Sequence, residues 1–156
     1  MSAGADRVRA LVELVVDALE LDGSVRVEET DDAIVATVDG EDLGLFIGRH
    51  GQTIEAVQHL AQRAVLKDHG PEAVRRRIVV DAAGYRARRQ EALEGEAADA
   101  ADEAVQYGRA VALDAMTASE RRIVHEFLRD RGDVETHSEG EEPERHLVVS
   151  PAQSSA

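Results

Sequence analysis

Gly48, Arg49, His50 and Gly51 form the part of this sequence best suited to bind an anion. The two glycines lack a Cβ atom, so they permit left-handed backbone angles and the close approach of a ligand backbone. The apolar repeat after Gly51 predicts a helix, whose first N–H groups and positive dipole end would face the turn. Arg49 adds a fixed positive charge and His50 a titratable one. The pattern favours a small anion site, and an ordinary turn between two helices is the alternative.

A second candidate is the pair Arg121 and His125, four residues apart in a segment predicted to be helical. At about 100° per residue they stand about 40° apart, on one side of the helix and just outside its apolar stripe. Arginine binds phosphate or stacks on a base, and histidine adds a hydrogen bond or a stacking face. A solvated helix edge, neutralised by Glu120 and Glu126, is the alternative.

The net charge of the chain opposes binding to nucleic acid. There are 32 acidic and 18 basic residues, which gives a net charge of -14. The excess is uneven, because residues 41–80 carry 5 acidic and 6 basic groups while the other stretches of the chain are all negative. We interpret the acidity as a contribution to solubility. A local binding site on an acidic background is therefore expected.

Several classes of chemistry are excluded by what the sequence lacks. It has no Cys, so it has no disulfide, thiolate nucleophile or Cys-based zinc site. Its 6 His fall on different predicted elements without metal-site spacing, and no nucleophile or phosphate-loop motif occurs. It shows neither a long apolar run nor a leader-like start. We expect a cytoplasmic binding protein with no enzymatic activity, cofactor, metal or stable membrane insertion.

Hydrophobic periodicity predicts alternating helices and strands in the first half of the chain. Apolar residues at helical or alternating spacing lie between turns rich in Gly, Asp and Pro. The predicted order is a helix over 6–20, strands over 25–28 and 34–38, a short helix over 41–47, a helix from about 51 to 67, and a strand over 77–81.

The second half begins with a long segment rich in Ala, Glu and Arg. This segment, 85–106, is predicted to form a solvated connector helix that buries little. An extended stretch at 111–113, a helix over about 120–131, and strands over 134–137 and 146–149 follow. The helix should bury Ile123, Val124, Phe127 and Leu128. Residues 152–156 are small and polar, and we expect them to be disordered.

The run Ile47-Gly48-Arg49-His50-Gly51-Gln52-Thr53-Ile54 resembles the defining Ile-Gly-x-x-Gly-x-x-Ile element of a KH domain. The additional elements N-terminal to it are similar to the bacterial type II form, and the resemblance covers residues 6–82. It implies that residues 48–51 clamp the backbone of about four nucleotides. Ile47 and Ile54 would lie beside the base-binding groove, so Ile47 is also a candidate contact. Arg75, Arg76 and Arg77 are either backbone contacts or a solubilising edge.

The C-terminal part resembles an R-three-H domain, a family that binds single-stranded nucleic acid. The resemblance rests on residues 120–125, 134–141 and 145–151, and it extends over about 86–151. It implies that Arg121 and His125 are the signature pair and that Arg122 is an accessory phosphate contact. Residues 109–151 form the core of this domain, and the helix 83–108 is either a connector or part of it.

A KH domain followed by an R-three-H domain is the arrangement of the bacterial Jag family, also called SpoIIIJ-associated or KhpB. The fold class expected is therefore α+β, with two small domains. The resemblance implies a protein that binds single-stranded RNA, or single-stranded DNA, and influences cell elongation and envelope synthesis. It also implies a small single-KH partner. An adaptor associated with the membrane insertase or the ribosome is the alternative. Many members have a further N-terminal domain, and roles that depend on it are not expected of these residues.

Overall fold

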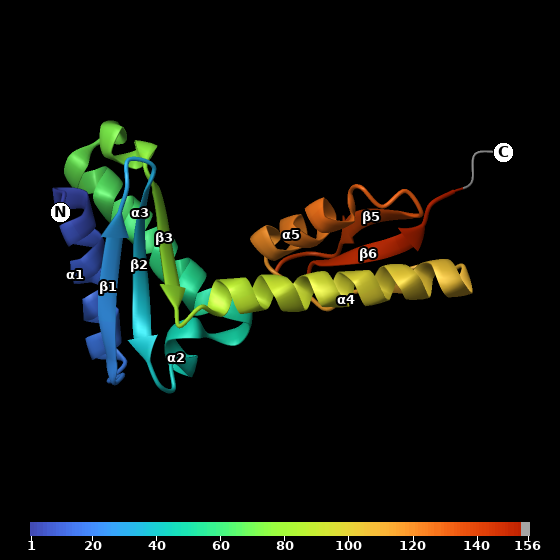
Figure 1. The fold of residues 1–156 in the computed structure, drawn as a ribbon, viewed down its shortest axis with the longest axis horizontal. Helices are drawn as coiled ribbons and strands as arrows, with labels where there is room; N and C mark the ends of the chain where they lie inside the picture. The colour runs from blue at the N-terminus through green and yellow to red at the C-terminus, as the bar shows by residue number, and fades with distance from the viewer. Residues whose placement is uncertain (154–156) are drawn as a thin grey trace. The chain divides into compact units, whose positions relative to one another are not determined.

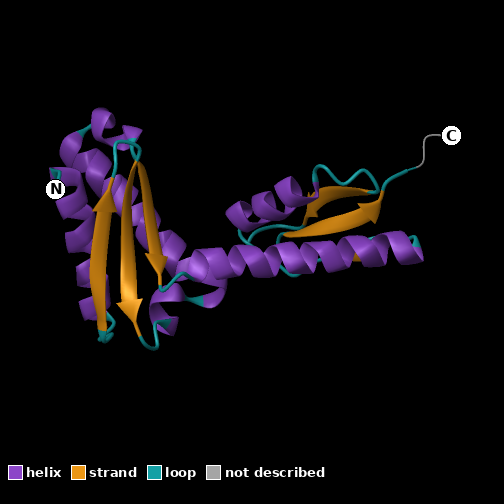
Figure 2. Cartoon of the chain, in the orientation of Figure 1, coloured by secondary structure: helices purple, strands orange, loops and turns teal. Residues whose placement is uncertain are grey.

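The computed structural model describes residues 1–153, apart from the side chains of residues 73 and 74. The chain divides into two compact units, the first ending at Arg86 and the second beginning at Ala87. Each unit combines helices with a three-stranded sheet (Figures 1 and 2). Each also has its own apolar core. The expected α+β fold class is confirmed.

The first unit has the predicted order of helix, strand, strand, helix, helix and strand. β1 and β2 pair in antiparallel fashion, and β2 and β3 pair in parallel. A parallel pair needs a long crossover connection, which α2 and α3 provide here. The elements are α1 (Ala3–Ala18), β1 (Gly23–Glu29), β2 (Ala33–Gly40), α2 (Gly44–Ile47), a 3-10 turn (Arg49–Gly51), α3 (Gln52–His69), a second 3-10 turn (Pro71–Arg75) and β3 (Arg77–Ala82).

One face of this sheet is buried beneath α1 and α3 (Figure 1). Burial alternates along β2 and β3, as expected when one face of a sheet is covered. The two helices contribute apolar residues at three- and four-residue spacing to the same core. Fully buried members of this core are Ala5, Val8, Val12, Ala36, Val38, Phe46, Ala61, Val65, Val80 and Ala82.

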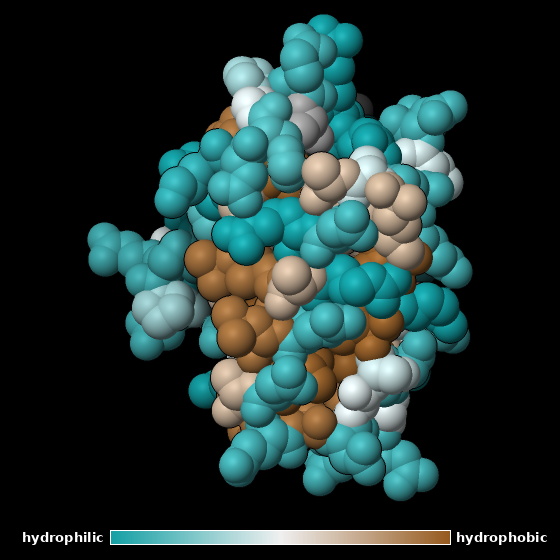
Figure 3. Space-filling view, turned by 90° about the vertical axis from the view of Figure 1, so that its left-hand side faces the viewer, coloured by the Kyte–Doolittle hydropathy of each residue, from teal (hydrophilic) through white to brown (hydrophobic). Residues whose placement is uncertain are grey.

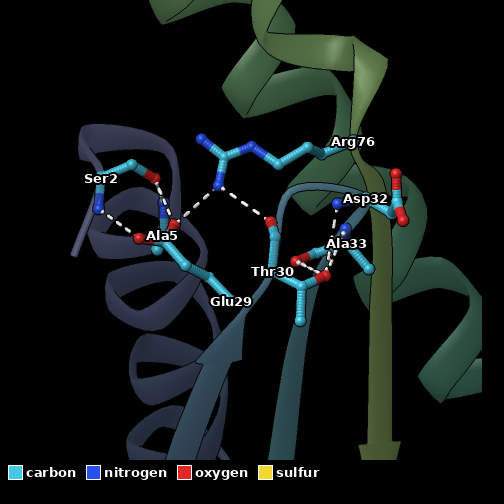
Figure 4. A network of polar contacts seen from close by, with 7 residues as sticks. All are labelled: Ser2, Ala5, Glu29, Thr30, Asp32, Ala33 and Arg76. Carbon is cyan, nitrogen blue, oxygen red and sulfur yellow. Dashed lines mark hydrogen bonds and ion pairs between the residues drawn. The ribbon is translucent and has the colours of Figure 1, made fainter.

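A polar network around Glu29 ties the start of α1 to the end of β1 and to the segment before β3 (Figure 4). The Glu29 carboxylate accepts hydrogen bonds from the Ser2 backbone N–H at 2.9 Å and the Ser2 hydroxyl at 2.6 Å. It also pairs with Arg76 at 2.9 Å. Because Ser2 also caps α1 by accepting from the Ala5 N–H, one carboxylate fixes three segments. The hydrogen bonds from Ser2, together with Arg76, hold the pKa of Glu29 below its usual value of 4.5.

The second unit packs two helices against an antiparallel sheet with strand order β4-β6-β5. A capping box starts its second helix, because the Thr117 hydroxyl accepts from the Glu120 N–H and the Glu120 carboxylate accepts from the Thr117 N–H. The elements are α4 (Tyr85–Tyr107), which begins in the first unit, β4 (Val111–Ala112), α5 (Ala118–Leu128), β5 (Val134–Glu139) and β6 (His146–Pro151).

The prediction that 85–106 is a solvated connector is wrong. One side of α4 is buried: Leu93, Ala97, Ala101 and Ala104 are fully buried and Ala100 is 4% exposed. These residues belong to the same core cluster as residues of α5, β5 and β6. Alanine presents little apolar area but allows close packing, so counting large apolar residues overlooks such a stripe.

Two further details differ from the sequence-based expectation. α5 ends at Leu128, and Phe127, predicted to be buried, is 43% exposed. The buried stripe contains Glu120, Val124 and Leu128 at four-residue spacing, which turns Phe127 towards solvent. Of the predicted disordered tail, Ala152 donates a hydrogen bond to the Asp133 carbonyl at 2.8 Å, and 154–156 lie outside the described residues.

Replacing Glu29 with Gln should lower the melting temperature at neutral pH and flatten its dependence on pH. Because the pKa of Glu29 is lower in the folded state, its carboxylate stabilises the fold above about pH 4.5, and this contribution is lost as pH falls through the folded pKa. Thermal unfolding followed by circular dichroism between about pH 3 and 7 measures the effect. Glu28→Gln, at the exposed neighbouring position, is the control, and equal effects of both variants would contradict the role of Glu29.

Candidate nucleic-acid interface

The Gly48–Gly51 segment makes a sharp turn between α2 and α3. Three of its residues have positive φ angles, 73° at Gly48, 55° at His50 and 78° at Gly51. Glycine adopts these angles without steric cost, whereas His50 is strained by roughly 1 kcal/mol. The Gly51 N–H donates to the Gly48 carbonyl at 3.3 Å, which closes the turn.

The two glycines are required by the protein's own chain. A Cβ atom at Gly48 would lie 2.8 Å from the backbone N of Thr53, and one at Gly51 would lie 2.8 Å from Cε1 of Tyr85. Both positions are closer than a real Cβ atom allows. The sequence predicts glycines that admit a ligand backbone, but in the structure they let the turn pack on α3 and on the Tyr85 ring.

Apolar residues on both sides anchor the turn in the core. Phe46 is fully buried and Ile54 is 1% exposed. Ile47, the predicted neighbour of a base-binding groove, is half-buried and packs against the same core. The backbone from Ile47 to Ile54, which contains the turn, is therefore anchored at both ends.

The turn forms a candidate anion site at the start of α3. The helix begins at Gln52, and no side chain caps its first N–H groups. Its positive dipole end is therefore available. Arg49 is exposed and makes no ion pair or hydrogen bond with another described residue, and His50 is half-buried. By contrast, Arg76 is held by Glu29.

The second candidate site is a hollow between α5 and the β5–β6 hairpin in the second unit. Its lining includes the three predicted residues, Arg121, Arg122 and His125, together with His137 and Arg145. His125 Nδ1 forms a hydrogen bond with the Thr136 hydroxyl, which joins α5 to β5. Three arginines and two histidines thus meet in one concave surface.

Arg121 is more buried than its sequence position predicted. The residue is 9% exposed, and its guanidinium donates to the Met116 carbonyl at 2.7 Å and to the Glu142 carboxylate at 2.8 Å. The prediction that it lies outside the buried stripe is wrong, because the side chain is held by an acceptor just before α5 and by one in the β5–β6 turn. Arg122, with 80% of its side chain exposed, forms an ion pair with Glu126 at 3.1 Å.

His137 and Arg145 are site residues that the sequence argument did not single out. His137 pairs with Glu139 at 2.8 Å, and Arg145 donates to the Gly140 carbonyl at 2.7 Å. Their place depends on the hairpin register, in which His137 lies opposite Val148. The acidic turn between two short predicted strands left that register open.

The described residues meet the requirements of neither a membrane-spanning helix nor a metal site. None of their helices is long and apolar enough to cross a membrane. Nor do they contain a cluster of His, Asp or Glu suited to hold a metal ion.

Two family models match the chain in succession. The model of the KhpA/KhpB KH domain matches residues 5–78, and the model of the R-three-H domain matches residues 91–151. The chain therefore contains a KH domain followed by an R-three-H domain, as the sequence predicted.

Curated relatives extend the match over nearly the whole chain. Proteins named RNA-binding protein KhpB from Clostridium symbiosum, Bacillus subtilis and Lactiplantibacillus plantarum are 36%, 31% and 36% identical over 93%, 92% and 96% of the chain. The chain spans 65%, 69% and 46% of the lengths of these proteins. It belongs to the KhpB family.

Replacing Arg121 with Ala should destabilise the second unit by about 1–3 kcal/mol, because the Met116 carbonyl loses its charged donor in a buried position. Urea unfolding measures this loss. Arg122→Ala, the matched change at the adjacent exposed position, should leave stability within about 0.5 kcal/mol of wild type. Equal stability of the two variants would show that Arg121 has no structural role.

Proposed function

We propose that this chain binds single-stranded RNA at two sites, the Gly48–Gly51 turn and the hollow beside α5. The observation that carries the proposal is the exposed, unpaired Arg49 at the uncapped start of α3. The KhpB relatives are named RNA-binding proteins, which supports RNA as the ligand. Roles in cell elongation and envelope synthesis, and an adaptor role at the insertase or ribosome, stay predictions.

The electrostatics of the two sites favour weak binding at each. In the hollow beside α5, carboxylates of the chain already contact Arg121, Arg122 and His137. A phosphate must compete with these carboxylates. Each neutralised phosphate of a single strand contributes about -0.7 to the slope of log affinity against log salt. With two or three such contacts we expect a shallow slope between about -1.4 and about -2.1. Two weak sites on one chain gain from effective concentration.

Exchanging both Arg49 and His50 for Asp should weaken RNA binding by about tenfold or more, since two carboxylates would face the start of α3. Fluorescence anisotropy with a labelled single-stranded oligoribonucleotide measures the affinity. The DNA oligonucleotide of the same sequence shows whether the ribose contributes.

Arg109→Asp is the charge control for this variant, because Arg109 is an exposed residue of the second unit. It should cost much less affinity than the double change. Equal losses would mean that bulk repulsion, and not the turn, determines binding. Unchanged affinity of the double variant would remove the turn from the site.

An apolar surface on the first unit favours a protein partner as well. Leu14 of α1 is 63% exposed and Leu60 of α3 is 54% exposed, while Leu11 and Val15 are only partly buried. The face that carries α1 shows apolar side chains gathered among polar ones (Figure 3). We infer that these helices dock a second KH domain, that of a small single-KH protein. The matching family model, which covers both KhpA and KhpB, supports this partner.

Leu60→Asp should weaken association with a single-KH partner by about tenfold, because a charge would be desolvated in an apolar contact. Sedimentation velocity of mixtures measures the complex. Val105→Asp, which alters a 43% exposed residue of α4, should leave it intact. Association that survives Leu60→Asp would place the partner elsewhere.

A further inference from the structure

The edge strand β3 has backbone groups that side chains already occupy. Gln58 Oε1 accepts from the Val80 N–H at 3.0 Å, and Arg86 Nε donates to the Val80 carbonyl at 2.7 Å. Gln62 Nε2 donates to the Ile78 carbonyl at 3.5 Å. An edge strand normally offers such groups to another strand or to a ligand. Along this part of β3, a ligand meets side chains instead.

The amide of Gln58 has a fixed orientation. Its oxygen accepts from two groups, the Val80 N–H and Arg86 Nη2, the latter at 2.9 Å. Because both partners are donors, only the amide oxygen fits on that side, and Nε2 lies on the other. No described residue accepts from Nε2, and no buried side-chain nitrogen among the described residues is unpaired. Two N–H donors of Gln58 therefore remain open to solvent.

Tyr85 and Arg86, which are consecutive in the chain, contact the glycine turn and the Gln58 amide respectively. Along α3, Gln58 follows Gly51 by seven residues, which is roughly 10 Å of helix. That distance falls within the stretch of about four nucleotides that a turn of this kind clamps.

We propose that Gln58 selects guanine over adenine in RNA held at the Gly48–Gly51 turn, which rests on the RNA binding proposed above. A glutamine with both amide atoms free pairs with adenine by accepting from N6 and donating to N7. Gln58 only donates, because its oxygen is occupied. Guanine presents two adjacent acceptors, O6 and N7, whereas adenine presents one acceptor beside a donor.

The test compares the oligonucleotides r(UUG)3 and r(UUA)3, which differ only in the purine, on the full chain at one salt concentration. Wild type should bind the guanine oligonucleotide about threefold to tenfold more tightly, the effect of one hydrogen bond. Gln58→Glu keeps an oxygen for Val80 and Arg86 but removes both donors, so the affinity ratio should fall to about one. Equal affinity in wild type, or an unchanged ratio in Gln58→Glu, overturns the proposal.

Two controls separate base selection from charge and folding. Ala56→Glu adds the same charge at an exposed position on another side of α3 and should keep the wild-type ratio. A loss of the ratio in this variant as well would overturn the role of Gln58. A third oligonucleotide carries 7-deazaguanine, which lacks the N7 acceptor, in place of guanine. Wild type should prefer it over r(UUA)3 less strongly than it prefers r(UUG)3, and an undiminished preference counts against the proposal. Binding of neither oligonucleotide refutes the RNA binding itself, whereas binding without purine preference refutes only the role of Gln58.

Discussion

The excess of carboxylates over cations is the constraint on which the rest of this molecule depends. With 32 acidic residues against 18 basic ones, most arginines are engaged by the chain's own carboxylates. Arg76 pairs with Glu29 and Arg121 with Glu142, so both act in folding. Each exposed ion pair contributes little to stability. Together these pairs neutralise most arginines, so they determine which arginines can still bind a polyanion. Within the described part of the chain, Arg49 is among the few arginines with no ion pair or hydrogen bond from the side chain.

The two candidate sites meet this constraint in different ways. The turn before α3 relies on a helix dipole and on backbone N–H groups, which no side chain among the described residues caps. The hollow beside α5 relies on side chains, and a phosphate there must displace Glu142 from Arg121 or Glu126 from Arg122. Because that exchange replaces one anion with another, the net gain in binding free energy is small. The turn is therefore the stronger of the two sites on physical grounds.

Periodicity and turn chemistry were sufficient to predict the order of elements in both units and the Gly48–Gly51 turn. They did not predict the burial of a residue where that burial depends on contacts with distant parts of the chain. The alanine stripe of α4 is buried because neighbouring elements approach closely, which no count of large apolar residues reveals. The burial of Arg121 depends on acceptors at Met116 and Glu142, one before and one well after it in the chain. The need for Gly51 arises from the Tyr85 ring, 34 residues away in the sequence, which no local pattern contains.

The contact with Tyr85 also shows that the first site is larger than its helix–turn–helix. After β3 the chain passes through two left-handed residues, Ala83 with φ 47° and Gly84 with φ 72°. This reversal returns the next two residues to α3, where Tyr85 meets Gly51 and Arg86 meets Gln58. Both residues lie beyond position 78, where the match to the KH family model ends. In an acidic protein, where charge adds little affinity, a neutral amide held by such contacts is a suitable means of selecting a base.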